Sequence, residues 1–151
     1  MAFMDRMATL EQAKLAALSG VMDEALKLVD ILLANDPKDI EALCFKGNTL
    51  ELAYLSDPTT NTDSDEAQHD NRVLCAKECY EEALSLDAFN IRALRDSADN
   101  LKLIGNIVGA RCFYQKLAII LKGQTLSGTS GVAIEEELEE VLQELNELGS
   151  P

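Results

Sequence analysis

Apolar residues along the chain recur three and four positions apart, which is the spacing of one face of an α-helix. Six segments have this pattern, at about residues 4–18, 22–35, 37–55, 65–86, 90–103 and 107–121. Val, Ile and Thr form no alternating runs, whereas Ala, Leu, Glu and Lys dominate. Because these four residues are mostly strong helix formers, the pattern predicts an all-α protein.

Turn-forming residues separate the segments. Because proline fits the first turn of a helix, we expect the third helix to start at Pro37. A longer interruption occupies residues 56–71, of which only 56–63 have the composition of a loop. Asp63 or Ser64 can cap a helix whose first turn is acidic. We therefore expect most of this insertion to extend the fourth helix at its N-terminus, so that it stands beyond its neighbours.

A seventh amphipathic segment lies near the C-terminus. Residues 123–131 are rich in Gly, Ser and Thr, which predicts a flexible linker. In residues 132–149 the apolar side chains fall on one side of a helix, and seven glutamates cover the rest. The expected organisation is a domain of residues 4–122, a linker of residues 123–131 and an acidic helix of residues 132–149.

A short signature recurs in the second, fourth and sixth helices. It consists of a small residue, an aromatic or apolar residue four positions on, and a small or apolar residue three positions further. Its copies are Ala25, Val29 and Leu32; Ala76, Tyr80 and Ala83; and Ala110, Tyr114 and Leu117. Ala110 follows Ala76 by 34 residues, and Ala76 follows Ala25 by 51, which is 34 plus 17. The chain is therefore one unit repeated three times with an insertion in the second copy.

Helix pairs repeated every 34 residues, with this signature in the second helix, resemble the tetratricopeptide repeat (TPR) family. The resemblance covers residues 6–38, 39–90 and 91–124, and it implies a right-handed α-α superhelix of three helix pairs. The first helices match less well, because the family's Leu-Gly pair survives only as Lys46-Gly47 and its closing proline only as Pro37. The small positions are those at which two helices approach closely.

The resemblance implies a concave groove, made by the first helix of each pair, that holds an extended peptide or a partner helix. Carried onto this sequence, the groove is lined by Leu10, Lys14 and Ala17; by Glu41, Cys44, Asn48 and Glu51; and by Arg92, Arg95, Asp99 and Lys102. The amide of Asn48 is of most interest, because it can bond both the N–H and the C=O of a bound backbone.

Some members of the family grip the acidic C-terminus of chaperones with a carboxylate clamp. The clamp positions of this chain hold Leu10, Lys14, Phe45, Arg92 and Asp96, so the clamp is broken and we expect no binding of chaperone tails. Arg92 and Arg95 either form a smaller anchor for anions or pair with acids nearby, as surface charges commonly do.

The charge balance limits the kinds of partner. The net charge is −14, and 12 of the 27 acids lie in residues 57–70 and 135–147. Nucleic-acid binding needs basic patches, so we expect none. No stretch is apolar enough to insert into a membrane, and the N-terminus has no secretory signal pattern. We therefore expect a cytoplasmic protein whose four cysteines are buried free thiols.

Residues that could carry chemistry are few. Cys75 and Cys79 lie one helical turn apart, but His69 is the only histidine and lies too far away for us to expect a zinc site. The sequence has no Gly-rich phosphate loop and no nucleophile beside a plausible base. We expect no cofactor and no enzyme activity.

Two functions remain open. The first is a scaffold or adaptor that binds a protein or peptide in its groove. The second is a structural protein that uses its groove or C-terminal helix to form homo-oligomers. The acidic helix itself has three alternatives: it caps the last repeat, pairs with another chain, or folds back into the groove to meet Arg92, Arg95 and Lys102.

Overall fold

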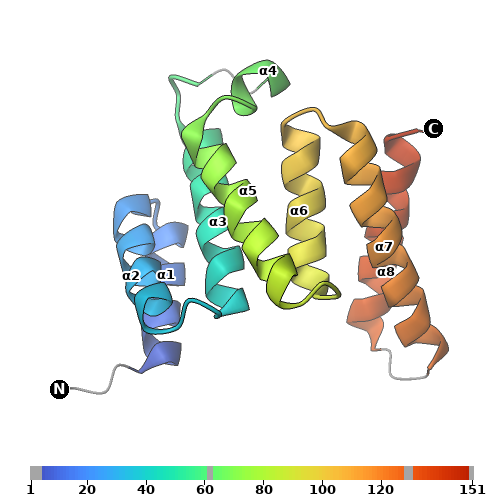
Figure 1. Ribbon diagram of the computed structural model, residues 1–151, viewed down its shortest axis with the longest axis horizontal. Coiled ribbons are helices and arrows are strands. Elements are labelled where there is room, and N and C mark those ends of the chain that lie inside the picture. The colour runs from blue at the N-terminus through green and yellow to red at the C-terminus, as the bar shows by residue number, and fades with distance from the viewer. Residues whose placement is uncertain (1–4, 61–62, 128–130, 150–151) are drawn as a thin grey trace.

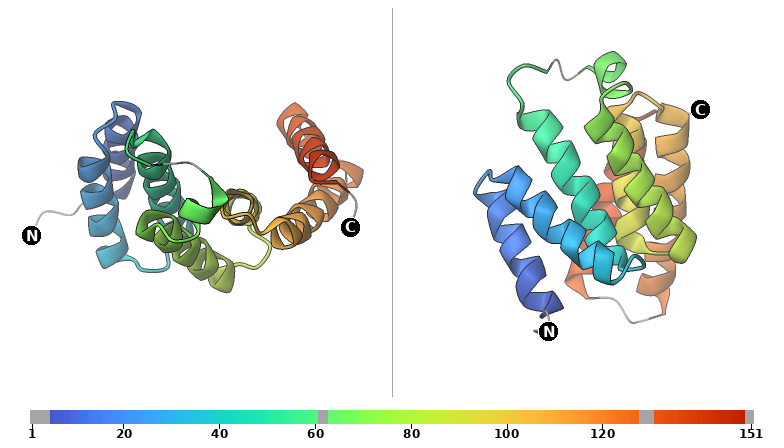
Figure 2. Two further views of the ribbon diagram at one scale, coloured as in Figure 1. Left: turned by 90° about the horizontal axis from the view of Figure 1, so that it is seen from above. Right: turned by 60° about the vertical axis from the view of Figure 1, so that its left-hand side comes forward.

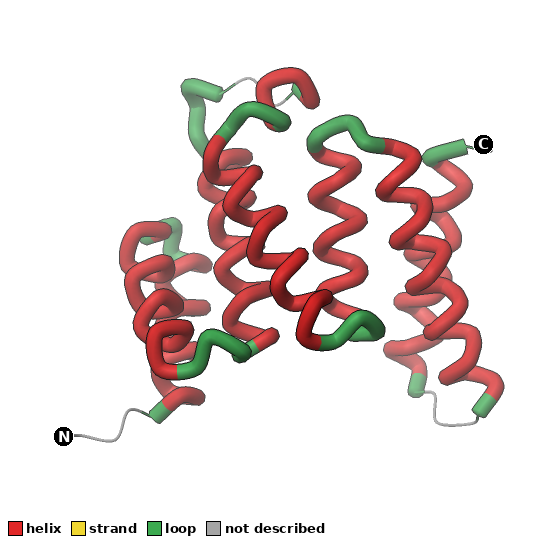
Figure 3. Tube along the Cα trace, in the orientation of Figure 1, coloured by secondary structure: helices red, strands yellow, loops and turns green. Residues whose placement is uncertain are grey.

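The computed structural model describes residues 5–60, 63–127 and 131–149. Every regular element in these residues is a helix, which confirms the predicted all-α class (Figure 3). The helices are α1 (Arg6–Leu18), α2 (Met22–Asn35), α3 (Ile40–Ser56), α4 (Ser64–Ala67), α5 (Asn71–Leu86), α6 (Ile91–Leu103), α7 (Ile107–Leu126) and α8 (Val132–Glu147).

The long helices form a row of hairpins. α1 packs on α2, α3 on α5 and α6 on α7, and α8 packs against α7 at the end of the row (Figure 1). Seen from above, the row is curved (Figure 2, left). α3, α6 and α8 lie around the inner side of the curve, whereas α5 and α7 lie outside it. We call the surface formed by α3, α6 and α8 the inner face.

Side-chain caps set where several helices begin. Asp39 caps α3 because its carboxylate accepts a hydrogen bond from the backbone N–H of Ala42 at 3.1 Å. Pro37 consequently lies in the turn before α3, and the prediction that it starts the third helix was wrong. Asp39 also accepts two hydrogen bonds from Arg6, at 2.6 and 2.8 Å, which fasten the start of α1 to the start of α3.

The insertion does not extend the fourth helix, so that prediction was also wrong. α4 ends at Ala67, and α5 begins only at Asn71, because Asp70 caps it. Arg72 then joins the two ends of the insertion, at 3.0 Å from Asp57 and 2.9 Å from Asp70. Ala67 is fully buried beside Tyr54 and Val73, so the insertion folds back over the ends of α3 and α5.

The C-terminal part also differs in its boundaries. α7 continues to Leu126, so the first part of the expected linker is helical. Residues 128–130 of that linker lie outside the described residues. α8 ends at Glu147, two residues before the expected end, and Gly149 follows with a φ of 79°. That backbone conformation is one that glycine adopts readily, and it is common just after a helix.

The repeated signature forms the contacts within each hairpin. Ala25, Ala76 and Ala110 are fully buried. The larger residue of each copy is Val29, Tyr80 or Tyr114, and each is at most 1% exposed. A side chain on the first helix has to be small opposite these residues, and in the second hairpin that residue is Gly47. The core therefore sits where the signature predicts it.

Candidate functional site

A chain of hydrogen bonds crosses the inner face from α5 to α6. The Tyr80 hydroxyl donates to Asn48 Oδ1 at 3.0 Å, and Asn48 Nδ2 donates to Asp96 Oδ2 at 3.2 Å. The amide that we expected to hold a ligand backbone is thus bonded to two side chains of its own chain. Its role in the fold is to connect α3 to both neighbouring helices.

Two carboxyl groups on this face lie in an environment that disfavours their charge. Glu51 accepts a hydrogen bond from Asn100 Nδ2 at 2.9 Å. Among the described residues, Glu51 forms no ion pair with a cation. Burial raises the pKa of Glu51 to about 7 and that of Asp96 to about 6. Asp96 has only a loose ion pair, since Arg92 Nε lies 3.6 Å from its Oδ2.

These carboxyl groups make stability depend on pH. The folded protein keeps a proton on Glu51 up to about pH 7, whereas the unfolded chain releases it near its ordinary value. Stability therefore falls as the pH rises between these two values and stays low above the higher one. We expect Glu51→Gln to remove part of this fall and to raise the free energy of unfolding at pH 8 by about 1–3 kcal/mol.

The measurement is urea unfolding at pH 5 and pH 8. Glu139→Gln is the matched control, because it removes one negative charge from the exposed side of α8. Equal pH slopes for Glu51→Gln and wild type would contradict the prediction. At low pH the dependence of stability on pH has the opposite sign. The reason is that hydrogen bonds from Arg6 and Arg72 lower the pKa values of Asp39 and Asp70. The stability that these pairs contribute is lost as the pH falls through their lowered values.

The arginines and the lysine predicted to line the groove are paired within the chain. Arg95 forms an ion pair with Glu137, and Lys102 Nζ lies 2.6 Å from Glu144 Oε2. Both acids belong to α8. Asp99 accepts a hydrogen bond from the Tyr114 hydroxyl, and burial raises its pKa. The prediction that cations pair with nearby acids therefore describes Arg92 and Arg95 better than an open anchor for anions.

Of the three alternatives for the acidic helix, the contacts of α8 match the cap on the last repeat. Val141 is 2% exposed and packs into the core of α6 and α7, together with Ile134, Leu138 and Leu145. The apolar side of α8 thus caps the last hairpin. Its glutamates at the same time reach Arg95 and Lys102, without the helix entering the groove.

The remaining predicted groove residues divide into buried and paired ones. Leu10 is 3% exposed and Cys44 is fully buried, so the prediction that they line a groove was wrong. Ala17 packs beside the core of α1 and α2. Lys14 Nζ lies 3.5 Å from Glu41 Oε1, and Glu41 accepts a second contact from Arg6.

Phe45, at one of the clamp positions, is buried in the core formed by α1, α2 and α3. Cys79 is buried like Cys44, but Cys75 and Cys112 are exposed, so the expectation that all four are buried was wrong. No group of three or more His, Cys, Asp or Glu side chains in the described residues could hold a metal ion.

Sequence reasoning missed the part played by the two tyrosine hydroxyls. Tyr80 donates to Asn48, which follows Gly47, and Tyr114 donates to Asp99, which follows Ala98. The two pairs are 32 and 15 residues apart, and the difference is the 17 residues by which the second copy of the repeat is longer, so the sequence does contain this signal. It identifies Asn48 and Asp99 as equivalent positions fixed by the packing of the hairpin.

Comparison with known proteins assigns no family. No family model matches the chain, and no curated protein matches it. A crystal structure of MamA is similar with a TM-score of 0.31 and 14% identity, covering 97% of this chain and 98% of that chain. A second MamA crystal structure has the same TM-score and identity, with coverage of 94% and 90%. A TM-score and an identity this low support no conclusion about function.

None of the helices in the described residues is both long enough and apolar enough to cross a bilayer.

Proposed function

We propose that the chain is a TPR-type interaction module of three helix pairs, capped by α8, that binds a basic segment of another protein on the inner face. The repeated signature and the row of hairpins support the module. The chemistry of the inner face supports the sign of the partner's charge. Arg95 and Lys102 are already paired with α8, whereas Glu51 of the inner face has no ion pair with a cation among the described residues.

The observation that carries the proposal is the state of Glu51 and Asp96. A carboxylate in such surroundings destabilises the fold, and burial raises the pKa of both groups. An arginine or lysine of a partner would pair with the charged forms and lower their pKa values again. Binding and stability then oppose each other at Glu51, because the same charge that favours the ligand weakens the free protein.

This opposition gives a direct test. Random 12-residue peptides displayed on phage are selected on the immobilised protein, and the selected peptides are resynthesised with citrulline in place of arginine. We expect selected peptides to be rich in arginine and lysine, and the citrulline versions to bind at least about tenfold more weakly. Binding is measured by fluorescence anisotropy at two salt concentrations.

The variants decide whether the inner face is the site. Glu51→Gln is expected to weaken binding about tenfold while it stabilises the free protein. Glu139→Gln removes the same charge from the far side of α8 and is expected to leave binding within about twofold. Equal losses in both variants would show that the net charge of −14 attracts the peptides unspecifically, and would contradict the proposal.

Self-assembly is the second candidate, and exposed residues of α1 favour it. Met7 is 71% exposed, Leu15 62% and Leu18 85%. α8 is the less suitable surface, because its apolar side is packed on α7. Light scattering of the full chain separates the candidates. A stable oligomer that Leu15→Glu converts to a monomer, together with no selected peptide, would favour assembly over peptide binding.

A further inference from the structure

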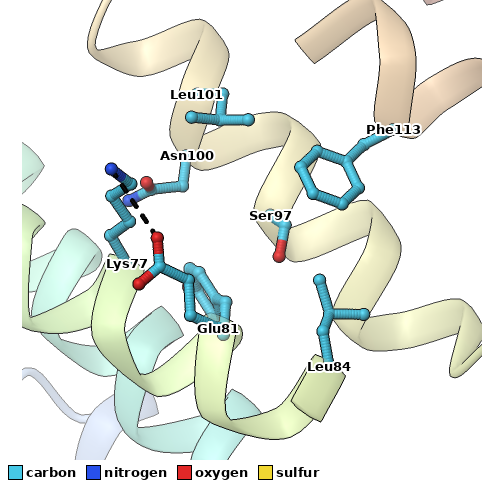
Figure 4. Close-up of a pocket in the computed structure, with 8 residues that line it drawn as sticks. Lys77, Glu81, Leu84, Ser97, Asn100, Leu101 and Phe113 are labelled. Carbon is cyan, nitrogen blue, oxygen red and sulfur yellow. Dashed lines mark ion pairs between the residues drawn. The ribbon is translucent and has the colours of Figure 1, made fainter. Parts of the chain in front are cut away.

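A pocket lies on the other side of α6, away from the inner face. It has a volume of about 130 Å³ and is lined by residues of α5, α6 and α7 (Figure 4). Leu84 of α5, Leu101 of α6 and Phe113 of α7 give it apolar walls. The ion pair between Lys77 and Glu81, at 3.6 Å, lies at its edge.

Two of the α6 residues that line this pocket, Ser97 and Asn100, each carry a buried polar atom that has no hydrogen-bond partner among the described residues. These atoms are the hydroxyl oxygen of Ser97 and the amide oxygen Oδ1 of Asn100. Asn100 is 1% exposed, and its Nδ2 is already used by Glu51 and by the carbonyl of Val73. Because buried polar atoms are nearly always bonded, such a pair on adjacent turns of one helix indicates a ligand that supplies the missing bonds.

The requirements of the pocket define the ligand. Asn100 Oδ1 can only accept a hydrogen bond, so the ligand needs a donor. Ser97 can donate in return to an oxygen of the ligand. The walls and Phe113 suit a flat apolar body, since aromatic rings pack well edge to face. An engineered cavity of about 150 Å³ accommodates benzene, so a pocket of this size suits a single ring.

We propose that this pocket binds a phenol group, whose hydroxyl donates to Asn100 Oδ1 and accepts from Ser97, while its ring lies between Leu84, Leu101 and Phe113. The group is either the side chain of a tyrosine in a partner protein or a free small phenol. The proposal does not rest on the proposed function, because the ring would lie against Leu84, Leu101 and Phe113, although Asn100 also joins the pocket to the inner face through its hydrogen bond to Glu51.

The test is a titration of the full ¹⁵N-labelled chain with p-cresol, followed by NMR. We expect saturable shifts of the backbone amides of Ser97, Asn100 and Phe113. Toluene has the same ring and methyl group without the hydroxyl, and it is expected to bind at least about tenfold more weakly. N-acetyl-tyrosine amide distinguishes the sources: tighter binding than p-cresol indicates a protein partner, and exclusion indicates a small molecule.

Variants locate the binding. Phe113→Ala is expected to weaken p-cresol binding about fivefold or more, whereas Phe89→Ala, at a side chain that is 75% exposed and outside this pocket, is expected to leave it unchanged. Ser97→Leu fills the pocket from α6 and is expected to abolish binding. Leu84→Trp fills it from α5 and serves if Ser97→Leu does not fold. Absence of saturable shifts at about 20 mM p-cresol, equal binding of toluene, or equal effects of the two phenylalanine variants would overturn the proposal.

Discussion

Replacement of Gly47 by leucine is expected to lower the free energy of unfolding by about 3 kcal/mol or more, although leucine is the better helix former. A Cβ atom at this position would lie 2.4 Å from Tyr80 Cε1 and 2.6 Å from Tyr80 Cζ. Tyr80 is 1% exposed, and its hydroxyl is bonded to Asn48. Relief of this contact requires the ring to break its bond to Asn48 or α3 and α5 to separate.

Gly123 provides the control, because it also lies within a helix but nothing lies within 4 Å of the position that its Cβ would take. Gly123→Leu is expected to keep or raise the stability by up to about 1 kcal/mol. Urea unfolding of both variants measures the difference. The cause is checked in a Tyr80→Ala background, in which the cost of Gly47→Leu should largely disappear. A Gly47→Leu protein as stable as wild type would contradict the tight contact.

The part of the fold that the sequence predicts well is the part that local packing decides. Ala76, Tyr80 and Ala83 mark the second helix of a hairpin because close helix contacts demand their sizes. The same tyrosine also reaches the inner face through its hydroxyl, which fixes Asn48. The signature therefore describes the core and also determines which polar side chains are held in place on the inner face.

The parts that the sequence did not predict depend on residues far apart in the chain. Arg6 reaches Asp39, which lies 33 residues away in the chain. Helical periodicity gives a face for each helix, but it does not say how far a neighbour covers that face. For this reason Leu10, which was assigned to the groove by its place in the repeat, is covered by α2 and α3.

The insertion illustrates the same limit. The acids after residue 63 suit a helix start, and α4 does begin at Ser64. Asp70 then caps a new helix instead of continuing the old one. The deciding contacts are those of Arg72 with Asp57 and Asp70, which hold the two ends of the insertion together. Local propensity allowed both outcomes, and the ion pairs favour the folded-back one.

Val141→Asp is expected to release α8 from the array and to lower the free energy of unfolding by about 3 kcal/mol or more. Val141 is the buried residue of α8 and is 2% exposed in the core that includes Leu117 and Leu121. A carboxylate there would lose its hydration among the apolar side chains of that core. Because this destabilises the docked helix and leaves the other helices in contact with one another, α8 should detach before the hairpins unfold.

Hydrogen exchange followed by NMR measures this order, and the expected result is loss of protection in α8 together with retained protection in α3 and α5. Leu142→Asp is the control, because that neighbouring side chain is 40% exposed and lies outside the core cluster. Release of α8 also removes Glu137 from Arg95 and Glu144 from Lys102. Because the freed cations repel a basic peptide, Val141→Asp is expected to weaken binding of the selected peptides. Unchanged binding would mean that α8 does not set the charge of the inner face.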